Sequence, residues 1–250
     1  MALDAGTRLI AALTRNQQRF SPILGFPLTT QNARSLDISV SNKELQKYKR
    51  HEDYVRTLDH ANFIWYDRSF SFVLLKNLLL FTHKHRLGGY GEERNIYAQS
   101  TSYSQTNRCI HLGVDITLKF NTPIYTPFLG RVHSFQNNNQ PFDYGPTIIL
   151  EHDLEENVHF YTLYGHLSTV SLENLTVGQT FEVGQLLAYI GDKSENGGWN
   201  PHLHFQIISD MGEMKGDYPG VASKIDAPTM LHNCPDPQFI LGFPEKPIIY

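Results

Sequence analysis

Hydrophobic positions follow two different periods along the chain. Near the start, Leu3, Leu9, Ile10 and Leu13 form an apolar face at helical spacing. Asp4, Arg8 and Arg15 lie on the polar side, so residues 2–19 are predicted to form an amphipathic helix. Residues 21–31 contain prolines and a glycine and are predicted to form a loop.

The next stretch carries weaker signals. Ser41, followed three residues later by Glu44, is a helix-start signature that predicts a short polar helix over residues 42–50. Residues 53–64 and 70–84 are compatible with either a helix or a strand, and a helix is slightly favoured for the second.

From about residue 108, short alternating runs separated by turn residues predict β-strands. Residues 151–157 are predicted to form the turn of a hairpin. The sequence therefore predicts a mainly β, mostly antiparallel and barrel-sandwich-like domain (closed or sandwich-like) with an N-terminal helical extension, α+β overall. The extension is placed at residues 1–100, and the β-rich domain at residues 101–250 with a C-terminal tail that wraps it. The predicted strands cover residues 114–118, 124–126, 130–135, 147–152, 158–164, 179–183, 187–190 and 203–208.

Composition and charge narrow the class of protein. The formal net charge of −4 gives no basic surface of the kind that binds nucleic acid or anionic membranes. No apolar run is long enough to span a membrane, and the N-terminus lacks the basic start and apolar stretch of a secretory signal, so a cytoplasmic protein is expected. Cys109 and Cys234 are predicted to be two free thiols, with a single disulfide as the alternative.

Histidine is the unusual residue type, with 12 in the chain. His202 and His204 occupy positions i and i+2 of a predicted strand, so both side chains face the same side of the sheet. Asp115 begins another predicted strand, and His111 lies four residues earlier on the incoming turn, from which both side chains can reach one point. Two imidazoles side by side indicate a metal ion or a shared substrate.

These residue types suit zinc. A catalytic zinc ion usually takes three nitrogen, sulfur or carboxylate ligands and keeps a fourth position for water, whose pKa falls to about 7. Two histidines and Asp115 match that rule, so one zinc ion per chain is expected. Cys109 is a further possible ligand, but it is less favoured because no other thiolate accompanies it.

His166 follows a predicted strand and Gly165, which places it at the strand end beside the same site. His166 and one member of the His202/His204 pair would remain unligated, available to orient the attacking water and stabilise the oxyanion. Each pattern alone is more typical of an ordinary surface or core histidine. The three patterns in this order, each at a strand end, favour one shared site.

His111-x-x-x-Asp115, Tyr164-Gly-His166 and His202-Leu-His204-Phe together resemble the lysostaphin/LytM-type zinc metallopeptidases over about residues 108–210. The resemblance implies a β-rich fold and cleavage of peptide bonds, commonly in bacterial cell-wall cross-bridges. It also implies that His111, Asp115 and His204 are the zinc ligands and that His166 and His202 are the catalytic residues. All five positions are filled, so an active metal site is expected.

A closer likeness extends over more of the chain. Residues 88–94, 160–168, 196–206, 217–220 and 234–237 resemble a subgroup of these domains that is fused between a small-molecule-kinase-like domain and a class III aminotransferase. The given sequence contains no kinase or aminotransferase pattern. The subgroup is intracellular in appearance, which agrees with the expected location.

Two positions depart from the wall-lytic members of that family. Trp199 precedes the His-x-His strand, where those relatives usually have a small Gly/Ser-rich loop, and Gln206 stands where they usually have Glu. An indole beside the metal can narrow the groove or stack on a substrate. Both departures favour a smaller, more specific substrate than peptidoglycan.

Tyr90, Glu92 and Arg94 are candidates for lining a substrate channel. An equally good interpretation is a packing segment that ties the N-terminal part of the chain to the β domain.

The leading hypothesis is a zinc metallopeptidase, a hydrolase that uses metal-activated water to cleave a peptide or small amide substrate. One alternative is a metal-binding domain that holds a ligand without turnover, which is less favoured because a purely structural zinc takes four protein ligands. The other is an amidase acting on a small metabolite, which rests on analogy with the fused relatives. The sequence leaves the oligomeric state open.

Overall fold

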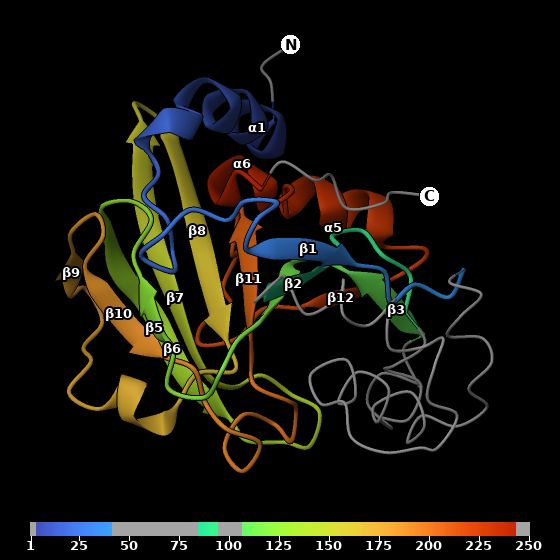
Figure 1. The fold of residues 1–250 in the computed structure, drawn as a ribbon. Coiled ribbons are helices and arrows are strands. Elements are labelled where there is room, and N and C mark those ends of the chain that lie inside the picture. Colours follow the sequence, from blue (N-terminus) through green and yellow to red (C-terminus); the bar gives the residue numbers. More distant parts are fainter. Residues whose placement is uncertain (1–3, 42–84, 95–106, 244–250) are drawn as a thin grey trace, which may run out of the picture.

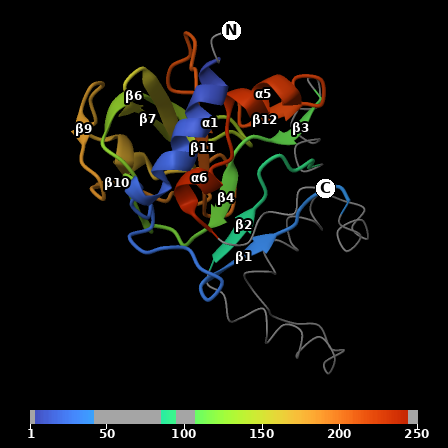
Figure 2. The ribbon, with the colours of Figure 1, turned by 90° about the horizontal axis from the view of Figure 1, so that it is seen from above.

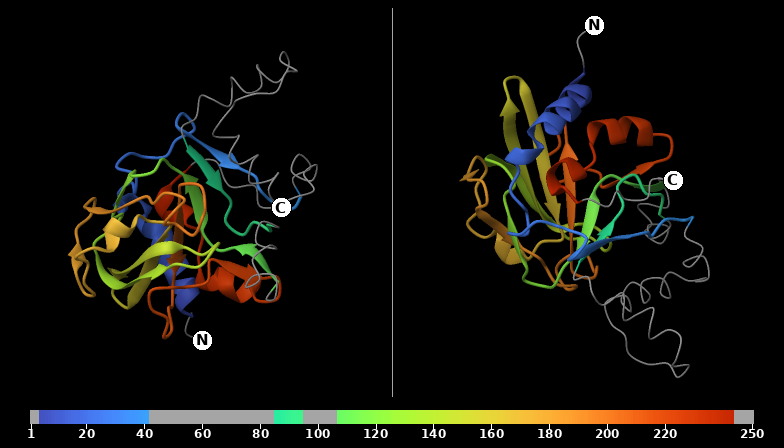
Figure 3. Two further views of the ribbon diagram at one scale, coloured as in Figure 1. Left: turned by 90° about the horizontal axis from the view of Figure 1, so that it is seen from below. Right: turned by 45° about the horizontal axis from the view of Figure 1, so that its top comes forward.

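A computed structural model describes residues 4–41, 85–94 and 107–243 of the chain, and its main feature is an eight-stranded sheet (Figure 1). All strand pairs in this sheet are antiparallel except the parallel pair β1–β2. β1 and β9 form its two edges, at opposite sides of the molecule in the left view of Figure 3, so the sheet is open. The predicted mainly β, mostly antiparallel fold is confirmed. In sheet order the strands are β1 (Ala33–Leu36), β2 (His85–Gly88), β4 (Val114–Thr117), β11 (His202–Ile208), β8 (Val158–Gly165), β7 (Gly145–Glu155), β6 (Gly130–Asn138) and β9 (Thr180–Phe181).

One face of the sheet is covered by a second, smaller layer. This layer comprises the two-stranded sheet β5 (Pro123–Tyr125) and β10 (Leu186–Tyr189), which packs into the same apolar cluster as the long strands. The short 3-10 helix Thr169–Leu172 leads from β8 toward this layer. The arrangement is therefore sandwich-like, which is one of the two forms that the sequence predicted, closed or sandwich-like.

The opposite face carries β3 (Arg108–His111), β12 (Val221–Ser223) and the helix α5 (Ala227–Asn233), which share a separate apolar cluster. Strand β11 shows how the two faces differ, because successive side chains alternate between them. Leu203 and Phe205 belong to the first cluster, so the side chains at 202, 204 and 206 face the second side. The histidines therefore lie on the face covered by β3 and β12.

The helix α1 (Ala5–Asn16) begins at Asp4, whose carboxylate accepts the Thr7 backbone N–H at 2.9 Å. Leu9, Ala12 and Leu13 form its buried stripe. It continues into a 3-10 helix (Gln17–Arg19), so the helix predicted at 2–19 is confirmed. At one end of the sheet, α1 contacts β8, α5 and α6 (Gln238–Leu241) (Figures 1 and 2). In the described part of the chain, no helix is long and apolar enough to cross a membrane.

Each of the eight predicted strand segments contains a strand, with shifted ends. The hairpin turn predicted at 151–157 was wrong in extent, because β7 runs to Glu155 and β8 starts at Val158, which leaves a two-residue turn. His111 lies in β3 and not in a turn, since the connection to β4 is only Leu112-Gly113.

Four short strands escaped the sequence-based prediction, namely β1, β2, β3 and β12. β1 and β2 extend the main sheet through the β2–β4 pair, and the proposed division at residue 100 stays a prediction. The helix predicted at 42–50 and the ambiguous segments 53–64 and 70–84 lie outside the described residues.

Candidate metal centre

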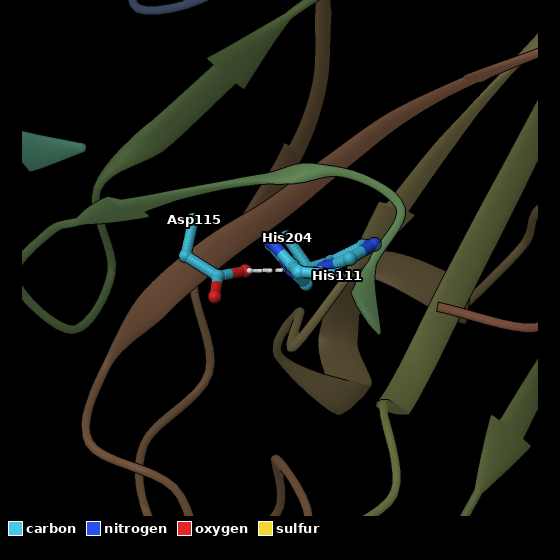
Figure 4. A group of neighbouring side chains, drawn as sticks. All are labelled: His111, Asp115 and His204. Atoms are coloured by element: carbon cyan, nitrogen blue, oxygen red, sulfur yellow. Dashed lines mark hydrogen bonds and ion pairs between the residues drawn. The ribbon is translucent and has the colours of Figure 1, made fainter. Parts of the chain in front are cut away.

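Strand register brings the predicted site residues to one place. His204 on β11 is paired directly with Asp115 on β4 and, on its other side, with Gly165 on β8. His111 ends β3, and the tight connection to β4 returns the chain beside Asp115. Figure 4 shows the three side chains converging, with the carboxylate pointing at the imidazole of His204.

The three ligand atoms form a nearly regular triangle. His111 Nε2 lies 3.1 Å from His204 Nδ1 and 3.3 Å from Asp115 Oδ1, and His204 Nδ1 lies 3.0 Å from the same carboxylate oxygen. Two ligand atoms on a tetrahedral zinc ion, each about 2.0–2.1 Å from it, are about 3.3 Å apart. Among the described residues, this is the group of His, Cys, Asp and Glu side chains that can share one ion. Cys109 is not part of it.

Hydrogen bonds on the outer side of the ligands set their protonation. The Gly89 carbonyl can only accept, so the 2.9 Å contact makes His111 Nδ1 the donor and leaves Nε2 with a lone pair. Gln206 donates its amide N–H to the Pro219 carbonyl at 3.1 Å, which turns Oε1 toward His204 Nε2 at 2.9 Å. His204 therefore donates from Nε2 and keeps its lone pair on Nδ1.

The Asp115 carboxylate is also oriented by a hydrogen bond on its outer side. Arg94 donates to Asp115 Oδ2 at 2.6 Å, which leaves Oδ1 facing the two imidazoles. Three electron pairs thus converge at the triangle with no hydrogen between them. A divalent cation is the partner that such a donor set fits, and outer partners of this kind are typical of metal ligands.

His166 and His202 lie beside the triangle, and the centroids of their rings are 4.1 Å apart. Each donates its Nδ1–H to a backbone carbonyl, His166 to Asn196 at 3.0 Å and His202 to Asn200 at 2.6 Å. Both keep Nε2 as an acceptor, and that of His202 lies 3.9 Å from Asp115 Oδ1. The two imidazoles are thus oriented and deprotonated at the nitrogen that can accept a proton.

His166 has left-handed backbone geometry, with a φ of 62°. Two backbone hydrogen bonds hold it there: its N–H donates to the Tyr144 carbonyl, and its carbonyl accepts the Gly191 N–H. A non-glycine residue kept in this region is a strained position of the kind that gathers at functional sites.

Burial and charge favour uncharged histidines. Burial, helped by Arg94, lowers the pKa of His111 to about 4. Burial also lowers the pKa of His166, with His202 adding to the effect, and it lowers the pKa of His202. Burial alone would raise the pKa of Asp115, but His111 and Arg94 outweigh it and hold that pKa well below 3.8. At neutral pH, these shifts favour uncharged rings for His111, His166 and His202 and a carboxylate at Asp115.

Of the four residues predicted to line a substrate channel, Trp199 lies next to the site. It lies beside His166 and His202, with its ring centroid 6.3 Å from that of His166 and 6.4 Å from that of His202. Its indole N–H donates to the Asp143 carbonyl at 3.2 Å, and its ring packs edge-on against Phe142. The indole is therefore held in place at the edge of the site.

The Tyr90 hydroxyl lies 2.6 Å from the Cys234 carbonyl oxygen and 3.0 Å from that of Leu231 at the end of α5, so its single proton anchors that end of the helix. Glu92 and Arg94 are buried and ion-paired, behind Asp115. In the described residues these three side chains make packing and ligand-supporting contacts.

Tyr144 lies beside the site, although the sequence analysis did not single it out as a site residue. Its ring packs against His166 and His204, and its hydroxyl is 3.4 Å from His204 Nε2. Gly165 leaves room for this ring, because a Cβ there would meet Tyr144 at 2.6 Å. No sequence signal marked Tyr144, since its position depends on strand pairing far along the chain.

Both cysteines are free thiols, which is one of the two predicted states. Cys234 is buried and accepts a hydrogen bond from Gln206 at 3.3 Å. Burial raises its pKa to about 12, so it is an uncharged thiol at neutral pH.

Among solved structures, the chain is similar to the catalytic domain of the antimicrobial peptidase lysostaphin from Staphylococcus simulans, with 23% identity, 69% of this chain and 98% of that chain covered, and a TM-score of 0.41. A zinc-containing peptidase from Vibrio cholerae is 26% identical, over 40% of this chain and 27% of that chain, with a TM-score of 0.33. This chain thus spans about a quarter of that peptidase. A catalytic-domain variant of the prophage-encoded M23 protein EnpA from Enterococcus faecalis is 20% identical, over 53% and 88% of the two chains, with a TM-score of 0.35.

No curated protein matches this chain. The resemblance to the fused kinase and aminotransferase subgroup stays a prediction. A family model does match: residues 109–215, less than half of the chain, correspond to a family described as Peptidase family M23, and all five predicted ligand and catalytic positions lie within that range.

Proposed function

We propose that this protein is a zinc-dependent hydrolase of the lysostaphin/LytM type that cleaves a peptide or amide bond. The observation that carries the proposal is the convergence of three unprotonated ligand atoms, at 3.0 to 3.3 Å from one another, inside the part of the chain that matches peptidase family M23. Two histidines and one carboxylate suit a catalytic zinc ion, which keeps a fourth position for a non-protein ligand.

The metal and the two remaining histidines divide the chemistry. His111, Asp115 and His204 would hold the zinc ion, which would supply Lewis acidity toward a carbonyl and toward a water molecule near neutral pH. His166 and His202 present Nε2 lone pairs beside that position, because backbone carbonyls hold the proton on Nδ1. They are placed to accept the proton of the attacking water and, once protonated, to hydrogen-bond the developing oxyanion.

The fixed indole of Trp199 favours a particular form of this activity. It stands beside both catalytic imidazoles and is restrained by Asp143 and Phe142. An amide substrate there meets a flat apolar surface next to the reacting bond, which supports a small amide-containing compound as a second candidate substrate. A cytoplasmic location is part of the proposal.

The test uses the full chain. Metal content is measured by mass spectrometry after purification without added metal, and hydrolysis is followed on glycine-rich peptides and on small N-acyl amides. We expect about one zinc ion per chain and an activity that His204→Ala abolishes. His159→Ala is the matched control, because His159 is exposed and pairs with Asp153 on the sheet surface. Absence of bound zinc at neutral pH, or full activity in His204→Ala, would refute the proposal.

The same experiment separates the non-catalytic alternative. A domain that only holds a ligand would bind zinc but release no product on long incubation, and His166→Ala would leave ligand affinity unchanged. A hydrolase instead loses turnover in His166→Ala while it retains zinc, since His166 Nδ1 and the ligand triangle have no shared hydrogen bond.

A further inference from the structure

Arg94 is a buried cation directly behind the metal centre. Only 2% of its side chain is exposed, yet it lies outside the residues that match the peptidase family. Its guanidinium donates to Asp115 Oδ2 at 2.6 Å, to Glu92 Oε2 at 2.7 Å and to the Gly89 carbonyl at 3.4 Å. Each of the three guanidinium nitrogens therefore has a different acceptor.

The contact with Asp115 decides how that carboxylate binds an ion. A free aspartate can offer both oxygens to a metal. Here Oδ2 is occupied by a charge-assisted hydrogen bond, so only Oδ1 faces His111 and His204. Arg94 thus holds the carboxylate as a one-oxygen ligand, which keeps the number of protein ligand atoms at three.

The contact with Gly89 extends the effect to a second ligand. The same carbonyl accepts the Nδ1–H of His111, so Arg94 and His111 share one acceptor. Gly88 makes room for the guanidinium, because a Cβ at that position would lie 2.7 Å from Arg94 Nη2. The sequence Gly88-Gly89 therefore serves both the arginine and the histidine.

Glu92 balances the buried charge. Its Oε2 pairs with Arg94, and its Oε1 accepts the backbone N–H of Ile38 at 2.8 Å. Without this carboxylate, Arg94 would be a net cation beside a cation site and would oppose metal binding. With it, the segment 88–94 presents a fixed hydrogen-bond donor at little net charge.

We propose that Arg94 is a positioning residue of the metal centre, which fixes Asp115 as a one-oxygen ligand and is itself oriented by Glu92. This inference rests on the proposed function, because it requires that His111, Asp115 and His204 bind a metal. It replaces the substrate-channel role considered for Glu92 and Arg94 with a role behind the ligands.

The test measures Co²⁺ and Zn²⁺ binding to the full chain with no substrate present. The visible absorption of bound Co²⁺ reports coordination number, because four-coordinate complexes absorb more strongly than five- or six-coordinate ones. In Arg94→Ala we expect Co²⁺ and Zn²⁺ affinity to fall at least about 10-fold, the size of effect typical for an outer partner of a ligand. We also expect the visible band to weaken, because both Asp115 oxygens become available.

Arg131→Ala is the matched control, since Arg131 is an exposed arginine that pairs with Glu151 and Asp153 away from the site. Guanidinium ion at millimolar concentration should restore affinity and band intensity in Arg94→Ala, whereas methylammonium should not. Should Arg94→Ala fail to fold, Arg94→Lys carries the test, because lysine keeps the charge but cannot reach three separate acceptors.

The outcomes separate this inference from the function it rests on. Wild-type metal binding with an unchanged spectrum and affinity within threefold in the folded Arg94 variants overturns the role of Arg94 and leaves the proposed function standing. Equal losses in the Arg94 variants and Arg131→Ala, or no rescue by guanidinium, also overturn it. A wild-type chain that binds neither metal overturns both.

Discussion

Gly113 offers a direct test of how closely the metal centre depends on its packing. It lies in the two-residue connection between β3 and β4, against the ring of His204. A Cβ at this position would be 2.6 Å from His204 Nε2, 2.7 Å from its Cε1 and 2.8 Å from the Phe205 carbonyl oxygen. Gly113→Ala therefore places a methyl group against a proposed metal ligand.

The size of the disturbance follows from these distances. Ordinary contact begins at 3.4 Å, so the imidazole must move by 3.4 − 2.6, about 0.8 Å. The methyl would also be too close to the backbone, since the Phe205 carbonyl oxygen is 2.8 Å from it. A functional site tolerates displacements of about 0.5 Å. The shift also strains the hydrogen bond from His204 to Gln206. We expect Zn²⁺ affinity to fall about 10- to 100-fold, as when an outer partner is lost.

Gly130→Ala is a matched control that makes the same clash at a different histidine. Its Cβ would lie 2.6 Å from His152 Cε1 and Nδ1 and 3.2 Å from the Glu151 carbonyl oxygen. Overpacking of this kind costs about 1–3 kcal/mol of stability in each variant. Unfolding in urea should therefore show similar losses for both substitutions, while competition with a chromophoric chelator should show weakened Zn²⁺ binding for Gly113→Ala alone.

The reasoning fails if Gly113→Ala binds Zn²⁺ within threefold of the wild type while its stability falls. That result would mean that His204 is not a ligand, or that the site absorbs a displacement of this size. Equal loss of Zn²⁺ affinity in Gly130→Ala would show instead that any loss of stability weakens binding.

Two further substitutions test buried polar groups. Burial lowers the pKa of His152 from 6.5 to about 4, so as the pH falls through this window the unfolded chain takes up a proton first and the folded state loses stability. At about 1.4 kcal/mol per pKa unit, the loss in the free energy of unfolding reaches about 3 kcal/mol below pH 4. Measured by urea unfolding, this free energy should decline less steeply in His152→Gln than in the wild type between pH 6.5 and 4; an unchanged slope would contradict this. In Gln206→Glu, a carboxylate oxygen would replace the N–H that donates to the Pro219 carbonyl. The free energy of unfolding should therefore fall by about 1–3 kcal/mol in the same assay. Stability equal to that of the exposed control Gln18→Glu would argue against this prediction.

Strand prediction succeeded where a segment carries its own pattern. β4, β7, β8 and β11 alternate or run apolar over several residues, and all were located from the sequence. β1 and β12 were missed because Ala33–Leu36 and Val221–Ser223 are short and become strands only through pairing with β2 and β3. Such elements depend on tertiary contacts that a local pattern does not contain.

In the candidate site, too, the features with a local sequence pattern were predicted and those that depend on tertiary contacts were not. The two-residue period of a strand was enough to predict that His202 and His204 share one face of the sheet. The hydrogen-bond acceptors that fix each ring could not be predicted in this way, since Gly89, Asn196 and Asn200 contribute backbone carbonyls that have no residue signature. The proximity of Arg94 to Asp115 likewise depends on long-range contacts, because Gly88 pairs with Asp115 and the Arg94 backbone N–H donates to the Cys109 carbonyl.

These outer contacts decide between a metal centre and a cluster of histidines that merely share a proton. His111 Nδ1 already donates its hydrogen to the Gly89 carbonyl, and His204 Nε2 donates its hydrogen to Gln206 Oε1. A proton shared between His111 Nε2 and His204 Nδ1 would therefore give one of the two rings a hydrogen on both nitrogens. That ring would be a buried cation next to Arg94. On His111 such a charge is disfavoured, because burial and Arg94 lower the pKa of that ring to about 4. A divalent ion satisfies the three lone pairs at once and adds no proton, and this is the physical reason to favour metal binding at this site.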